Sequence, residues 1–105
     1  MGECNIDVHP GVCKLKTSIR ATMNDNWQVV FDVESDCPNV MKLAGMLGPM
    51  DPMKNISVKF SESDVYRGAD ETIQHTACPV PCAMIKAIEV ASDMGLKRDV
   101  LIEIK

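Results

Sequence analysis

Cysteine thiols are the side chains of this sequence that are best suited to chemistry. The chain has 105 residues and contains five cysteines. Four of the thiols fall where helices or strands are expected to begin, namely Cys13, Cys37, Cys78 and Cys82. The start of a helix presents unpaired N–H groups and a positive dipole end, which favour the thiolate over the thiol. Gathered thiolates bind Zn²⁺ or an iron–sulfur cluster, because soft ligands select those centres.

The spacing of the cysteines leaves three interpretations open. Cys78-x-x-x-Cys82 differs from the C-x-x-C of zinc knuckles and ferredoxins, so a metal site is predicted from the number and placement of the thiols. In a second interpretation the cysteines are buried and structural, and the protein is a non-catalytic partner or subunit. In a third, Cys78 and Cys82 form a thiol–disulfide redox pair. The sequence gives no evidence of a turnover reaction, so a non-enzyme is favoured.

Two further residues bear on this site. His75 precedes Cys78 by three residues and is a candidate fourth metal ligand or proton-handling neighbour, with an exposed residue before a helix as the alternative. Cys4 lies within residues 1–13, which read as an irregular lead-in, and it is left out of the site. We expect Cys37 and Cys78 to react with alkylating agents at a lower pH than Cys4.

The elements that would position these residues are those of an α+β domain. Apolar residues alternate in three segments, and two others have helical spacing bounded by proline and glycine. The predicted elements are strands over 14–23, 29–34 and 100–104 and helices over 38–47 and 79–91. The order is β-β-α-(irregular)-α-β, in one domain over 1–105, with the two helices packed on one face of a sheet.

The stretch from 49 to 76 is the least readable part of the chain. Ile56, Val58 and Phe60 predict a short strand, and the serines and acids at 61–64 predict the start of a short helix. If the two main helices pack on the same face in the right sense, Cys37, Cys78 and Cys82 would converge at one end. Cys13, just before a strand, would reach that end.

Composition excludes several classes of function. The apolar fraction of 46% and charged fraction of 25% are those of a folded globular domain. A net charge of −4 without a basic cluster argues against nucleic-acid binding. No apolar run is long enough to span a membrane, and the N-terminus has no secretory signal. We therefore expect a cytoplasmic protein with reduced thiols.

The segment 75–91, together with Ser35-Asp36-Cys37 and Gly11-Val12-Cys13, resembles a small cysteine-rich domain family of methanogens and other anaerobes. That family has no assigned function. Its most specific part is Cys78-Pro79-Val80-Pro81-Cys82-Ala83, and the resemblance extends over nearly the whole chain. It implies an oxygen-poor setting, in which exposed thiolates and iron–sulfur centres survive.

Two remoter similarities concern the chemistry. The order of cysteines is similar to that of U-type iron–sulfur scaffold proteins, in which three cysteines and a nearby His or acid hold a cluster or zinc. The matching positions are Cys13, Cys37, Cys78 and His75, although His75 is not adjacent to Cys78 and Cys82 is extra. Thr76–Val80 is also similar to the Thr-Ser-Cys-Pro-Asp signature of a small cysteine domain. These similarities imply metal or cluster handling, or electron transfer, for a larger anaerobic enzyme as protein partner; a homo-oligomer is also compatible.

Overall fold

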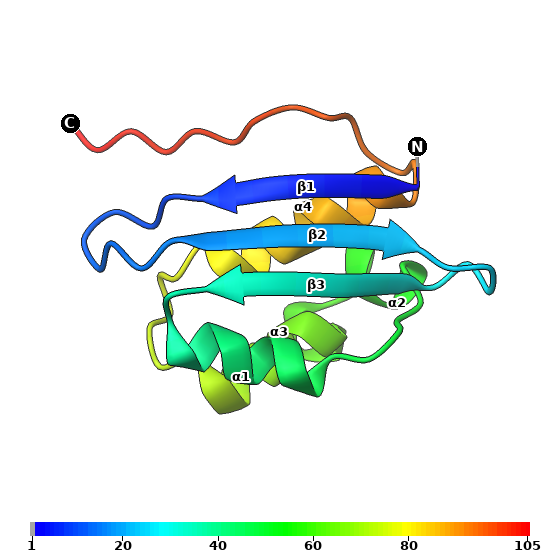
Figure 1. Ribbon diagram of the computed structural model, residues 1–105, viewed down its shortest axis with the longest axis horizontal. Coiled ribbons are helices and arrows are strands. Elements are labelled where there is room, and N and C mark those ends of the chain that lie inside the picture. The colour runs from blue at the N-terminus through cyan, green and yellow to red at the C-terminus, as the bar shows by residue number, and fades with distance from the viewer. Residues whose placement is uncertain (1) are drawn as a thin grey trace.

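The computed structural model describes residues 2–105 and forms an α+β domain with a three-stranded antiparallel sheet (Figure 1). The strands are β1 (Glu3–Val8), β2 (Thr17–Met23) and β3 (Val29–Ser35), in the order β1-β2-β3. The remaining elements are α1 (Pro38–Met46), α2 (Met53–Ile56), the 3₁₀ helix η1 (Phe60–Glu62), α3 (Asp64–Thr72) and α4 (Val80–Ala91). The predicted α+β class is confirmed.

One face of the sheet is apolar and packed, and the other is exposed to solvent. In register, Ile6 lies opposite Ile19, which lies opposite Val33, and these side chains share the covered face. The residues between them, such as Asp7 and Ser18, are exposed. This alternation with a period of two gives an antiparallel sheet one face to pack and one face to solvate. Helix α4 packs against β1 and β2, and α1 packs against β3.

Helix α4 supplies the centre of the core. Met84, Ala87, Ile88 and Ala91 are buried at spacings of three and four residues, which is the stripe that the sequence predicts. Pro81 lies in the first turn, where its missing N–H breaks no helical hydrogen bond. The helix therefore begins directly after the Cys78-Pro79 pair.

Helix α3 approaches α1 closely at a glycine. A Cβ atom on Gly68 would lie 2.8 Å from Cδ1 of Leu43, a side chain that is fully buried in α1. The absence of a side chain at Gly68 thus allows the two helices to pack together. Ser63 begins α3, and its hydroxyl accepts a hydrogen bond from the Tyr66 N–H at 3.3 Å.

A buried asparagine connects α2 to α3. Asn55 is 4% exposed, and its Oδ1 accepts hydrogen bonds from the Ser63 hydroxyl (2.9 Å) and the Val65 N–H (3.2 Å). Its Nδ2 donates to Oδ2 of Asp64 at 3.2 Å and to the Asp51 carbonyl at 3.3 Å. The middle of the chain is thereby fixed by polar contacts rather than by a strand.

Several element predictions were wrong. Residues 3–8 form β1 and not an irregular lead-in, and Cys4 is buried in it. Residues 14–16 precede β2, which begins at Thr17. The short strand expected at 56–60 is replaced by the end of α2 and by η1, whereas the short helix expected after 61–64 is present as α3.

The predicted last strand is absent from the described chain. Residues 96–105 have no regular secondary structure and run alongside β1 in the same direction as that strand (Figure 1). The sequence alternates as a strand should, but no ladder joins these residues to β1 or to any other strand. Among residues 2–105, no helix combines the length and apolar character needed to cross a membrane.

Candidate functional site

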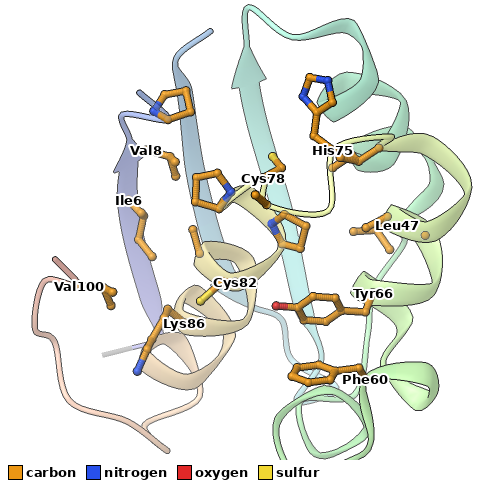
Figure 2. A pocket seen from close by; sticks show the side chains of 18 of the residues that line it. Ile6, Val8, Leu47, Phe60, Tyr66, His75, Cys78, Cys82, Lys86 and Val100 are labelled. Atoms are coloured by element: carbon orange, nitrogen blue, oxygen red, sulfur yellow. The ribbon is translucent and has the colours of Figure 1, made fainter. Parts of the chain in front are cut away.

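The loops at one end of the sheet bring three cysteines into the same region. Cys13 lies in the loop after β1, Cys37 between β3 and α1, and Cys78 two residues before the first residue of α4. Because the strands are antiparallel, β1 ends, β2 begins and β3 ends at the same end of the sheet. The connection into α4 passes this end as well (Figure 1). Of the four cysteines predicted to meet at one end of the domain, Cys13, Cys37 and Cys78 do so, whereas Cys82 lies one helical turn further along α4 (Figure 2).

Cys37 is positioned by the end of β3. It is the N-cap residue of α1, as predicted from the following proline, but its side chain makes no capping hydrogen bond. Its N–H donates to the Ser35 hydroxyl at 3.1 Å, and that hydroxyl lies 2.7 Å from the hydroxyl of Thr17. The backbone of Cys37 is thus attached to β3 and, through the Ser35 hydroxyl, to the central strand β2, and its thiol is half-buried.

Cys13 is more exposed than Cys37 and Cys78. It is exposed and lies in a turn closed by a hydrogen bond from the Lys14 N–H to the Gly11 carbonyl at 3.0 Å. Gly11 has φ of +86°, a left-handed conformation that glycine adopts without strain.

Cys78 and His75 belong to one turn. The N–H of Cys78 donates to the His75 carbonyl at 3.0 Å. Figure 2 shows both side chains in the upper part of the pocket that it draws. His75 is exposed and Cys78 is half-buried. A donor nitrogen and a thiol therefore lie on the same short segment.

The expectation that Cys78 would ionise easily was wrong. Burial raises the pKa of the Cys78 thiol, and the nearby Cys37 and Cys13 thiols raise it further. The backbone N–H of Val80 at the start of α4 lowers the same pKa, but less than burial raises it. The helix start does stabilise the thiolate, yet loss of hydration is the larger effect.

Cys82 has different neighbours. It is exposed in the first turn of α4, and Figure 2 shows it one turn along the helix from Cys78, on the side of Tyr66 and Lys86. Burial raises the pKa of Tyr66, and the Cys82 thiol adds to this rise. The ring of Tyr66 packs edge-on against Phe60, with 5.1 Å between centroids.

The aromatic pair was not predicted as part of any site. Phe60, Tyr66, Cys82 and Lys86 line a small cavity of about 240 Å³ between η1, α3 and α4. The sequence carries no signal that singles out this pair, since Trp27 and Phe31 lie closer together along the chain than Phe60 and Tyr66. The proximity of Phe60 and Tyr66 to Cys82 depends on the packing of α3 against α4, which the sequence pattern does not reveal.

The thiols approach one another but do not form a closed ligand set. Among residues 2–105, no three side chains of His, Cys, Asp or Glu are close enough together to hold a metal ion. The interactions that raise the pKa of Cys78 show that Cys37 and Cys13 are within electrostatic range of it. Cys82 instead contributes to the raised pKa of Tyr66. His75 lies near Cys78 because the two residues share a hydrogen-bonded turn.

These features define a small α+β domain with half-buried and exposed thiols at one end of its sheet. Residues 4–104 match a family of unknown function (DUF6951), and the chain belongs to that family. No curated protein and no solved structure matches the sequence or the fold.

Proposed function

We propose that this protein binds a thiophilic metal centre, a zinc ion or an iron–sulfur cluster, through Cys13, Cys37 and Cys78. The observation that carries the proposal is that three separate connections bring Cys13, Cys37 and Cys78 to the same end of the sheet (Figure 1). Cys37 and Cys13 lie close enough to Cys78 to disfavour its thiolate and so raise its pKa further than burial alone.

A soft cation would offset the repulsion between neighbouring thiolates. Metal coordination deprotonates a thiol outright, so the positive charge offsets both the mutual repulsion and the raised pKa of Cys78. Metal affinity would then increase with pH, because each ligand must lose its proton before it binds. Zinc and iron–sulfur centres fit the donor set better than magnesium or calcium, which prefer oxygen ligands.

Coordination requires the ligands to move together, since they are not yet at bonding distances. Cys13 is the thiol that would move, because it is exposed in the loop after β1. Cys37 and Cys78 are half-buried and attached to the ends of β3 and α4. Metal binding would order the Cys13 loop against them, in keeping with the coupling of metal binding to folding.

His75 and Cys82 are the two candidates for the fourth ligand. His75 shares a turn with Cys78 and offers a nitrogen, whereas Cys82 is one helical turn further along α4. A centre held by three residues of this chain and an exchangeable fourth ligand suits metal or cluster transfer, or electron transfer, to a larger partner enzyme. This role fits a reducing, cytoplasmic and oxygen-poor setting.

The thiol–disulfide alternative has less support. A redox nucleophile needs a low pKa and access to solvent, whereas Cys78 is half-buried and its pKa is raised. Cys82 is exposed but directed toward Tyr66.

The decisive experiment is metal analysis of the chain purified without oxygen. We expect zinc, or iron with acid-labile sulfide, in stoichiometric amounts, and a loss of affinity of at least about tenfold in Cys13→Ser, Cys37→Ser and Cys78→Ser. Cys4→Ala is the matched control, because Cys4 lies in the core at the opposite end of β1. Metal-free protein with five titratable thiols, or equal loss in the control, would contradict the proposal.

A further inference from the structure

The segment after α4 exposes an unusual amount of apolar surface. Four large aliphatic residues within five positions are mostly exposed, namely Val100 (60%), Leu101 (78%), Ile102 (75%) and Ile104 (94%). Isolated exposed aliphatic residues are common, but a contiguous group marks a surface that is covered by something else. All four are residues of good strand propensity or apolar character, and they alternate with Glu103 and Lys105 at the end of the segment.

The sheet has a free edge beside this segment. Strand β1 pairs with β2 on one side, and no other strand of the described chain pairs with its outer side. The opposite edge is protected, because β3 forms a bridge to Met50 and is covered by α1. An edge with unpaired N–H and C=O groups is a template for another strand.

A groove separates β1 from the C-terminal segment. Residues 5–11 line it on one side and residues 98–102 on the other, and Figure 2 shows Ile6, Val8 and Val100 there. The groove continues between α3 and α4 and has an open volume of about 2120 Å³. The chain's own C-terminal segment therefore does not fill the space beside the outer edge of β1.

The chain's own C-terminal segment does not fit this edge. It runs in the same direction as β1 and ends beyond the end of that strand, and no ladder joins residues 96–105 to it (Figure 1). Ile102 and Ile104 remain mostly exposed.

We propose that residues 99–105 of a second copy of this chain add to β1 as an antiparallel fourth strand. In one register three of the four apolar residues lie opposite apolar residues of β1, and Leu101 lies opposite Asp7 on the solvent-exposed face. Ile102 of the second copy lies opposite Ile6, with Val100 opposite Val8 and Ile104 opposite Cys4. These side chains extend the covered face of the sheet beside α4, which already packs against β1.

The charges select this register. It places Lys105 of the second copy opposite Glu3 and leaves Glu103 opposite the neutral Asn5. A shift of two residues in one direction sets Glu103 against Glu3, and a shift in the other direction sets it against Asp7. Like charges directly opposite each other destabilise a strand pair, so both shifted registers are disfavoured.

The exchange is reciprocal. Each copy donates its C-terminal segment and receives the segment of the other, which is the self-complementary arrangement of a two-fold dimer. The interface does not involve Cys13, Cys37 or Cys78, so it is independent of the proposed metal site.

The first test is the oligomeric state of the full chain by sedimentation velocity over the micromolar range. We expect a dimer, and Ile102→Asp should weaken it at least about a hundredfold, because each dimer carries the substitution twice at a buried position. Val12→Asp is the matched control, since Val12 is 99% exposed and outside the interface. Ile102 is exposed within one copy, so its substitution should leave the far-UV circular dichroism spectrum unchanged. A monomer at all concentrations, or a dimer insensitive to Ile102→Asp, would overturn the proposal.

The second test reports the register. In Ile104→Cys the introduced thiol should lie opposite Cys4 of the other copy, at a spacing that a disulfide spans. Oxidised glutathione takes up the two electrons and two protons as the two thiols join. With a mixture of isotopically labelled and unlabelled chains, peptide mass spectrometry should find this disulfide between chains. Linkage within a single chain, or no linkage to Cys4, would refute the antiparallel register.

Discussion

The backbone N–H of Cys78 donates a hydrogen bond to the carbonyl oxygen of His75 at 3.0 Å. This contact makes the two residues a single structural unit at the entrance to α4. It explains how a histidine that is three positions away in the sequence can serve the same site as the thiol. The side chains around Cys78 then determine how readily it ionises.

The ionisation of Cys78 should depend on Cys37. The Cys37 thiol raises the pKa of Cys78, and its effect is larger than that of Cys13. Cys37→Ser should therefore lower the pKa of Cys78, Cys13→Ser should lower it less, and Cys82→Ser should leave it unchanged. The pH dependence of Cys78 alkylation, followed by mass spectrometry in metal-free protein, measures this order. Identical profiles in all three variants would mean that the thiols do not interact.

The sheet shows both the strength and the limit of sequence patterns. Alternation identified β2 and β3, because Ile19, Ala21 and Val33 recur with a period of two. The same alternation is present in β1, but Asn5 and Asp7 are poor strand formers and obscured it. Pairing with β2 overrides that local preference. Residues 100–104 show the converse, since their pattern is that of a strand but no partner pairs with them in the single chain.

The candidate site was predicted in part for a similar reason. Cys37 before a proline and Cys78 before Pro79 marked two helix starts, and both were found. The raised pKa of Cys78 was missed because burial depends on which elements pack around it. Sequence patterns locate the ends of elements, whereas the electrostatic environment arises only when those ends are assembled.

The stability of the fold should decrease in alkaline solution. Burial raises the pKa values of Cys4 and Cys78 above the ordinary value of 9.0 that applies to the unfolded chain. Between the unfolded and folded pKa values the folded protein binds more protons, so its free energy of unfolding falls as the pH rises. This contribution is fully present below pH 9.0 and is lost as the pH increases through the folded pKa values.

The melting temperature as a function of pH measures this effect. Cys4→Ala should flatten the alkaline decrease, although it lowers stability at neutral pH by removing a buried side chain. If the melting temperatures of Cys4→Ala and Cys78→Ala fall with pH as steeply as that of the unsubstituted protein, other groups are responsible for the decrease.

Asn55 should be essential for the middle of the chain. Replacement by alanine leaves the Ser63 hydroxyl and the Val65 N–H without their acceptor in a buried position. We expect Asn55→Ala to lower the free energy of unfolding by about 2–3 kcal/mol, because buried unsatisfied donors keep their desolvation cost. Asn26→Ala, in the exposed turn between β2 and β3, should change it by less than about 0.5 kcal/mol. Chemical denaturation compares the two, and equal effects would contradict the role of Asn55.

Two glycines in neighbouring helices should respond in opposite directions to the same change. In Gly68→Ala the new methyl group would lie 2.8 Å from Cδ1 of Leu43, a side chain that is fully buried. The Leu43 side chain or the two helices must shift, and we expect a cost of about 1–3 kcal/mol. Gly45 lies in α1 with nothing within 4 Å of an added Cβ, so Gly45→Ala should stabilise the protein by about 0.5–1 kcal/mol. Urea denaturation measures both free energies. A neutral Gly68→Ala would mean that α1 and α3 are not in close contact at this point.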